Sequence, residues 1–143
     1  MDSIDIEKTK QMLNLTEKPP MQLSPLVLAY IGDSVYELYI RTILVSRADD
    51  NVDVLNRKGS FYAKAVTQAR IMRTLEAELS ETEVSIYKRG RNAKSPTKAK
   101  NASVIEYRVA TGFEALLGFL YLSGSFDRLT EIVSRAIEIA ESE

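Results

Sequence analysis

The chain has 143 residues, of which 45% are hydrophobic and 27% are charged, and its formal net charge is −1. This length and composition predict one globular domain with its own core. The chain contains no His, Cys or Trp, which excludes nucleophiles activated by His and zinc or iron sites built on His or Cys. Carboxylate oxygens remain available as ligands for a hard cation such as Mg²⁺ or Mn²⁺.

The apolar spacing is helical nearly throughout, so we predict an all-α fold without strands. A short helix over residues 3–13, with Ser3 as a candidate N-cap, precedes a Pro-rich connector over 16–25. Pro25 suits the first turn of a helix that runs to about Ser46. Residues 52–79 are expected to be helical in two pieces, broken at Gly59-Ser60.

Ser80 and Glu83 form a capping-box pattern that starts a helix over 81–89, which we expect Gly90 to end. After a polar loop over 92–101, a long helix from Ser103 to about residue 122 and a last helix over 126–141 complete the chain. These elements predict six to seven helices. We expect residues 25–143 to form the single domain and residues 1–24 to be an N-terminal helix and connector.

We expect a cytoplasmic protein with no membrane contact. The absence of Cys fits a reducing compartment, and the N-terminal segment MDSIDIEKTK has mixed charge and no apolar signal core. The run from Leu26 to Val45 is long enough to resemble a membrane span, but Asp33, Glu37 and Arg41 within it argue against one.

Two acidic residues are isolated inside the most apolar runs. Asp33 is the only charged residue between Lys18 and Glu37, and Glu114 is the only one between Arg108 and Asp127. A carboxylate in apolar surroundings costs free energy unless something pairs with it or binds it. Strongly apolar helices usually pack together, so we expect the two carboxylates to meet and to form a magnesium site.

The alternative is a structural role, in which each acid is neutralised by an arginine such as Arg41 or Arg108. Gly32, directly before Asp33, costs about 1 kcal/mol relative to Ala inside a helix. We therefore expect Gly32 to allow either close helix packing or close approach of a ligand. The Tyr30 and Tyr107 side chains could line the acid site with a hydroxyl group, although aromatic residues in apolar helices more often pack in the core.

The middle of the chain is basic: residues 54–100 contain eleven basic and four acidic residues. Such a segment is either a solvated surface or the footprint of a polyanion. Beside a magnesium site we favour phosphate binding, because Arg forks onto phosphate oxygens and Lys acts as a point charge. The candidate residues for contacts with a nucleic-acid backbone are Lys88, Arg89, Arg91, Asn92, Lys94 and Lys98.

Two stretches resemble the signature motifs of the ribonuclease III catalytic domain: AYIGDSV at residues 29–35 and TGFEALLG at 111–118. The stretch KRGRNAKS at 88–95 is similar to a loop motif of the small bacterial branch, Mini-ribonuclease III, which consists of the catalytic domain alone. The resemblance covers the chain from about residue 26 to residue 140. It implies an all-helical two-fold homodimer that cuts double-stranded RNA with magnesium, for which manganese could substitute.

In the family motifs, Asp33 and Glu114 match the two essential metal-binding acids. The resemblance implies products with 5′-phosphate and 3′-hydroxyl ends, and a role in maturing both ends of the 23S ribosomal RNA precursor in the cytoplasm. A large-subunit ribosomal protein is a further candidate partner. Full-length members have Glu at the position of Ala29 and Asp at that of Thr111, so we expect water and phosphate oxygens to complete the metal shell.

Thr111 is therefore expected to line the site without binding metal. Helical spacing places Glu37 one turn after Asp33, which makes it a candidate supplementary ligand. The missing acids also motivate an alternative function, a dimeric RNA-binding scaffold that keeps the ribonuclease III-like fold but does not cut. A helical protein-interaction module with ion-paired acids is a third alternative, which leaves both motifs unexplained.

Overall fold

The computed structural model describes residues 6–16, 18–94 and 103–142. Within these ranges the chain forms seven α-helices and no strand, which confirms the predicted all-α fold. Two 3₁₀ turns lie at Pro20–Gln22 and Glu76–Glu78. The helices are α1 Ile6–Met12, α2 Pro25–Arg47, α3 Val52–Ala63, α4 Ala65–Leu75, α5 Glu81–Asn92, α6 Val104–Leu122 and α7 Phe126–Glu141.

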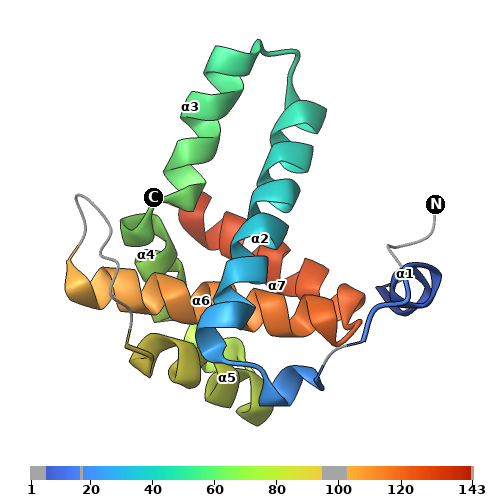
Figure 1. Cartoon of the computed structure of the whole chain (residues 1–143). Helices are drawn as coiled ribbons and strands as arrows, with labels where there is room; N and C mark the ends of the chain where they lie inside the picture. Colours follow the sequence, from blue (N-terminus) through green and yellow to red (C-terminus); the bar gives the residue numbers. More distant parts are fainter. Residues whose placement is uncertain (1–5, 17, 95–102, 143) are drawn as a thin grey trace.

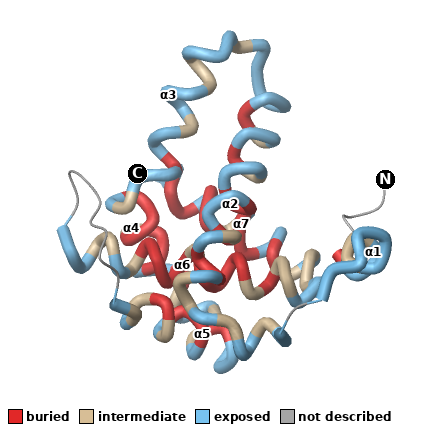
Figure 2. The backbone as a smooth tube through the Cα atoms, viewed as in Figure 1, coloured by how far each residue is buried: buried red, intermediate tan, exposed pale blue. Residues whose placement is uncertain are grey.

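Helix α6 is the central element of the fold. Helices α2, α4, α5 and α7 all pack against it (Figure 1), and buried residues are concentrated along it and on the facing sides of its neighbours (Figure 2). Phe113, Leu116 and Leu117 on α6 are all 0% exposed. A helix that is apolar all round must be covered on every side, and this explains why the second apolar run lies at the centre.

Helices α2 and α3 form a helical hairpin, the arm, that projects from the body (Figure 1). The N-terminal half of α2 packs on α6, and its C-terminal half packs on α3. Residues near the tip of the arm are mostly exposed (Figure 2). In the described part of the chain, no helix is both long and apolar enough to cross a membrane.

The predicted starts of α5 and α6 are confirmed by their capping hydrogen bonds. Helix α5 begins with a complete capping box between Ser80 and Glu83, and α6 begins with one between Ser103 and Glu106. Helix α6 ends before Gly124, whose φ of +73° is the left-handed conformation that glycine adopts at helix ends. Ser3, the candidate cap of the first helix, lies outside the described residues.

Two predicted boundaries were wrong. The break between α3 and α4 lies at Lys64, which is extended at φ −61° and ψ 141°, and Gly59-Ser60 lies inside α3. Two side chains from other helices satisfy the last carbonyls of α3: the Tyr36 hydroxyl donates to the Tyr62 carbonyl at 3.0 Å and the Gln68 amide donates to the Ala63 carbonyl at 3.0 Å. These tertiary hydrogen bonds stabilise a helix end at this point.

Gly90 also does not end α5, which continues to Asn92. A Cβ atom on Gly90 would lie 2.8 Å from the Cβ of Ala115 and 2.9 Å from the Cα of Gly112. Gly90 is therefore a buried packing position that lets α5 approach α6.

Candidate active site

The two isolated acids lie together because the backbones of α2 and α6 touch. A Cβ atom on Gly32 would overlap the carbonyl oxygen of Glu114, and one on Gly118 would overlap the carbonyl oxygen of Leu28. Only glycine permits this approach. Gly32 thus allows close helix packing, one of the two roles that the sequence left open. Asp33 is the next residue along α2, so this close approach brings it near Glu114.

The Glu114 carboxyl is partly buried and its pKa is raised to about 8. Burial is the main cause, and the charge of Asp33 and a side-chain hydrogen bond with Asp33 raise the pKa further. Asp33 itself is exposed. Two carboxyl groups that compete in this way favour either a shared proton or a bound cation.

No arginine neutralises this pair within the described ranges. The Arg41 guanidinium instead contacts the Glu37 carboxylate at 2.6 Å, and no ion pair joins Arg108 to either acid in the part of the chain that the structure describes. The structural role considered from the sequence, with each acid held by its own arginine, therefore does not describe this site.

The sequence analysis missed two uncharged polar residues: Gln68, which contacts Glu114, and Tyr36, which packs in the core beside the site. Gln68 on α4 is 1% exposed, and its Nε2 donates to Glu114 Oε2 at 3.4 Å. This hydrogen bond lowers the Glu114 pKa and so opposes the effects of burial and of Asp33. Tyr36 is 1% exposed, and burial, followed by the nearby Tyr62 and Glu114, raises the pKa of its hydroxyl. Nothing in the local helical spacing distinguishes either residue from an ordinary core or surface position.

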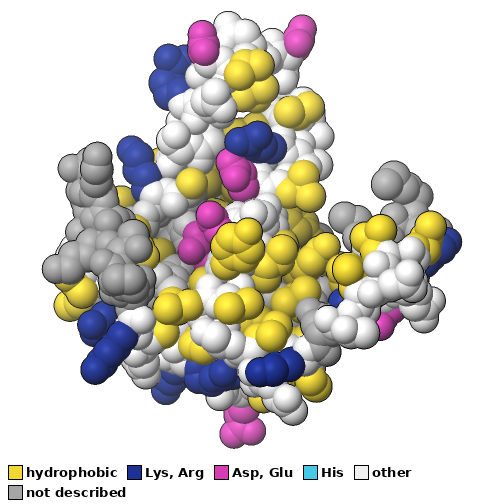
Figure 3. All heavy atoms as spheres, in the orientation of Figure 1, with side chains coloured by type: hydrophobic (Ala, Val, Ile, Leu, Met, Phe, Trp, Pro, Cys, Tyr) yellow, Lys and Arg dark blue, Asp and Glu magenta, His cyan; other side chains and the backbone are white. Residues whose placement is uncertain are grey.

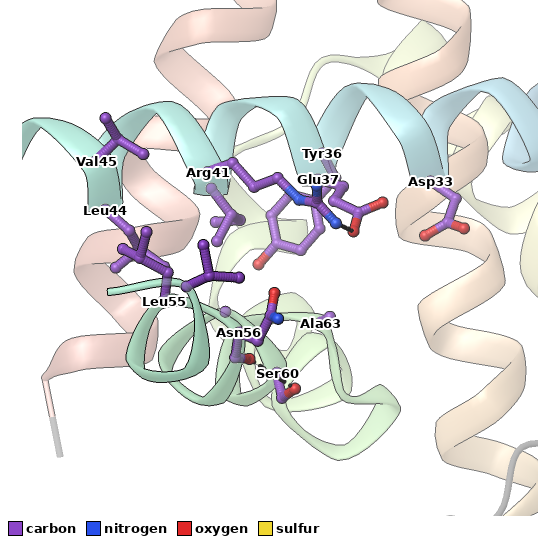
Figure 4. A pocket seen from close by; sticks show the side chains of 13 residues that line it. Asp33, Tyr36, Glu37, Arg41, Leu44, Val45, Leu55, Asn56, Ser60 and Ala63 are labelled. Atoms are coloured by element: carbon purple, nitrogen blue, oxygen red, sulfur yellow. Dashed lines mark hydrogen bonds and ion pairs between the residues drawn. The ribbon is translucent and has the colours of Figure 1, made fainter. Parts of the chain in front are cut away.

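A groove of about 590 Å³ runs along the arm between α2 and α3 and reaches Asp33 at one end. Its walls are largely apolar, with Ile40, Leu44 and Leu55 among them, and Asn56 and Ser60 face it from α3. Figure 4 shows Asp33 on the groove side of α2, apart from the hydrogen-bonded Glu37 and Arg41. Asp33 is therefore open to solvent on the arm side, whereas Glu114 does not line this groove.

Glu37 lies one turn after Asp33, as its spacing requires, but its carboxylate is engaged by Arg41. No group of three acids that could hold a metal is present among the described residues. Both side chains of the Glu37–Arg41 pair are more than half exposed, at 56% and 67%, so separating them would cost at most about 1 kcal/mol.

The other candidate lining residues differ in exposure. Tyr30 on α2 is 80% exposed and Tyr107 on α6 is half-buried. Thr111 is 8% exposed, and its hydroxyl donates to the Tyr107 carbonyl at 3.0 Å, within its own helix. Ala29 and Thr111, the positions at which the resemblance implies acids in full-length proteins, are thus small buried side chains here.

The basic candidates extend from α5 into the segment that follows it. Lys88 and Lys94 are exposed, whereas Arg91 is half-buried over the Tyr87 ring, with 5.7 Å between its guanidinium carbon and the ring centroid. Basic side chains gather along the lower edge of the molecule, where α5 lies (Figures 1 and 3). Asn92 is also exposed but accepts a hydrogen bond from Arg91, and Lys98 lies outside the described residues.

Arg89 has an additional structural role that its sequence did not indicate. Its guanidinium donates to the Met21 carbonyl at 3.3 Å and to the Leu23 carbonyl at 3.2 Å. These bonds hold the connector before α2 against α5.

The residues at the α2–α6 crossing fit a hard cation. The donor set consists of two carboxylates that lack a cationic partner within the described ranges, and all donor atoms are oxygens. Oxygen donors of this kind suit Mg²⁺ or Mn²⁺. Burial and the charge of Asp33 raise the Glu114 pKa, and a cation held by the two carboxylates would oppose both effects.

Comparison with known proteins gives one consistent family. A model of the ribonuclease III domain matches residues 26–125. Mini-ribonuclease 3 from Enterococcus faecalis is 50% identical over 119 residues, which cover 82% of this chain and 90% of that protein. Mini-ribonuclease 3 from Clostridium tetani is 46% identical over 127 residues, covering 88% of this chain and 84% of that protein.

The fold agrees with this result. A crystal structure of a Fusobacterium nucleatum protein is similar at a TM-score of 0.76 and 30% identity, and the match covers 85% of this chain and 98% of the other. The family match includes both acid-bearing helices, α2 and α6. The chain belongs to the ribonuclease III family, in its Mini-ribonuclease 3 branch.

Proposed function

We propose that this endoribonuclease hydrolyses phosphodiester bonds of double-stranded RNA with Mg²⁺, or Mn²⁺ in its place, held by Asp33 and Glu114. The observation that supports the proposal is the convergence of two otherwise unneutralised carboxylates at the glycine crossing of α2 and α6. The products would carry 5′-phosphate and 3′-hydroxyl ends.

The proposed roles of the side chains follow from their positions. Asp33 and Glu114 would hold the ion, which when bound would supply positive charge beside the scissile phosphate and lower the pKa of water. Asp33 is exposed and would face the RNA, while Glu114 is half-buried and anchored by Gln68. Glu37 would act as a supplementary oxygen ligand after releasing Arg41.

RNA binding is proposed to involve α5 and the residues that follow it. Lys88 and Lys94 are exposed, whereas the Arg89 guanidinium is engaged by the Met21 and Leu23 carbonyls. Arg89, Arg91, Asn92 and Lys98 would add contacts around them. Contacts of this kind to an A-form backbone read shape more than sequence, so the affinity should depend strongly on salt.

Two copies of the chain are proposed to form a two-fold dimer. The support is an apolar stripe on the exposed side of α2, here called the α2 stripe, formed by Val27, Tyr30, Leu38 and Val45, with exposures of 49%, 80%, 58% and 64%. Their spacing puts them on one helix face, and hydrophobic side chains gather on the face shown in Figure 3. A dimer would place two sites against opposite RNA strands and give a staggered double cut.

The biological substrate proposed from the family resemblance is the 23S ribosomal RNA precursor, cut at both ends in the cytoplasm. A large-subunit ribosomal protein is a candidate partner in that complex. At the proposed site, a bound cation would offset the repulsion between the two carboxylates and a polyanionic substrate.

Cleavage of a double-stranded RNA by three variants tests the metal assignment. Asp33→Asn and Glu114→Gln should each abolish cleavage while the far-ultraviolet circular dichroism spectrum is unchanged, because each removes one charged ligand. Glu37→Gln should raise the magnesium concentration needed for half-maximal rate. EDTA should stop cleavage by the wild-type protein.

Undiminished cleavage by Asp33→Asn would refute the assignment. An unchanged rate and magnesium dependence for Glu37→Gln would remove Glu37 from the site without affecting the rest. RNA binding by the wild-type protein without cleavage in magnesium would favour the scaffold alternative.

A further inference from the structure

We propose that Gln68 is a positioning residue that fixes the Glu114 carboxylate for the cation and ties it to the end of the arm. This inference rests on the proposed function, because it concerns the same cation site. Gln68 comes from α4, a helix that carries neither of the two acids.

The Gln68 amide joins two acceptors from different elements. Its Nε2 donates to the Ala63 carbonyl, the last residue of α3, at 3.0 Å and to Glu114 Oε2 at 3.4 Å. Both partners are acceptors, so the amide nitrogen, and not the oxygen, must face them. One side chain therefore uses its two N–H groups to connect the arm to the acid on the central helix.

Burial makes this arrangement rigid. Gln68 is 1% exposed, so its rotamer is fixed by the surrounding core. Its Oε1 is also buried and has no hydrogen-bond partner within the described residues. A methionine would fill similar space without burying an unpaired oxygen, so this core position carries an amide at a cost in stability. The two hydrogen bonds of Nε2, to the Ala63 carbonyl and to Glu114, offset this cost.

The contact to Glu114 has a definite chemical effect. The hydrogen bond from an uncharged donor favours the ionised carboxylate without competing for it as an arginine would. Gln68 engages only Oε2 of Glu114, so its hydrogen bond does not occupy the lone pairs of the other carboxylate oxygen. Partners of this kind orient metal ligands in proteins.

A purely structural role is the alternative, in which Gln68 serves only to satisfy the end of α3. Tyr36→Phe provides a matched control, because the Tyr36 hydroxyl donates to the neighbouring Tyr62 carbonyl at 3.0 Å and no hydrogen bond joins it to Glu114. Both Gln68→Met and Tyr36→Phe remove one hydrogen bond from the end of α3. Only Gln68→Met removes one from Glu114.

The test is isothermal titration of Mn²⁺ into the RNA-free protein, combined with thermal unfolding in EDTA. We expect Gln68→Met to weaken Mn²⁺ binding by roughly 10- to 100-fold, the usual effect of losing a partner of a metal ligand. Tyr36→Phe should lower the melting temperature while leaving the Mn²⁺ dissociation constant within about two-fold. Gln68→Asn, which is one methylene too short to span both acceptors, should weaken binding as Gln68→Met does, and it replaces that variant if Gln68→Met does not fold.

The outcomes separate this inference from the proposed function. If Asp33→Asn abolishes Mn²⁺ binding and the Gln68 variants bind as the wild type does, the proposed function stands and the role of Gln68 is overturned. If the wild type and Asp33→Asn bind Mn²⁺ equally, the cation site itself is wrong and the role of Gln68 falls with it. Equal weakening by Tyr36→Phe and Gln68→Met would also overturn the inference, because it would assign the effect to the end of α3.

Discussion

Burying the Glu114 carboxylate costs free energy, and the same carboxylate is the proposed ligand of a cation. Its pKa of about 8 means that burial and Asp33 together favour the protonated form near neutral pH. A cation between the two acids would reverse this preference, because it favours both charged carboxylates. The Gln68 hydrogen bond acts in the same direction as the cation.

The raised pKa of Glu114 should make the stability of the metal-free protein depend on pH. Because the folded-state pKa of Glu114 is raised, its contribution to stability is fully present below the unfolded-state value of about 4.3 and is lost as pH rises towards about 8. In EDTA, the melting temperature of the wild type should therefore fall relative to that of Glu114→Gln between pH 5.5 and 8. If the melting temperatures of the two proteins change with pH in parallel over that range, the pKa of Glu114 is not raised.

The sequence identified Asp33 and Glu114 as site candidates, but it did not identify Gln68, which donates a hydrogen bond to Glu114. Asp33 and Glu114 were found because a lone charge in an apolar run is conspicuous. Gln68 has no such signal, since an uncharged polar residue has the same helical pattern whether it faces water or the core. Likewise, the sequence cannot distinguish an arginine that binds phosphate from one that binds backbone carbonyls. Only the structure shows that Arg89 donates to the carbonyls of the connector.

At the scale of helices, the decisive feature is the backbone contact between α2 and α6. It depends on Gly32 and Gly118, each of which faces a carbonyl oxygen of the other helix. The apolar pattern predicted that these helices would pack, and it gave most helix bounds correctly. The break at Lys64 could not be predicted, because it depends on Tyr36 and Gln68 reaching the end of α3 from other helices.

A pair of glycine substitutions tests the crossing. Gly32→Ala should destabilise the fold by about 3 kcal/mol, the upper end of the cost of overpacking, because its Cβ would overlap the Glu114 carbonyl oxygen. Gly59→Ala is the control: its Cβ would meet nothing closer than Leu44 Cδ1 at 3.8 Å, so it should stabilise α3 by about 0.5–1 kcal/mol. Urea unfolding measures both. Equal effects of the two substitutions would show that α2 and α6 are not in backbone contact at Gly32.

At the scale of the whole molecule, the apolar pattern leaves one surface unexplained within a single chain. Four large apolar side chains form the α2 stripe on the exposed surface of a helix that also carries Asp33. Exposed apolar patches of this kind mark interaction surfaces. A second copy of the chain on this stripe would place its own acid site across the two-fold axis.

Light scattering on a sizing column tests that arrangement. The wild-type protein should have twice the mass of one chain, and Tyr30→Glu, which places a charge in the α2 stripe, should have the mass of a single chain. Val66→Glu is the control, because Val66 is 43% exposed on α4, away from the stripe. A Tyr30→Glu protein that remains a dimer would show that the stripe is not the contact surface.

The shared cation site is tested most directly by anomalous diffraction from crystals grown with Mn²⁺. We expect one anomalous peak at the crossing of α2 and α6, in contact with a carboxylate oxygen of Asp33 and with one of Glu114. Peaks bound to only one of these acids, or found only elsewhere on the molecule, would show that the two acids do not share a cation.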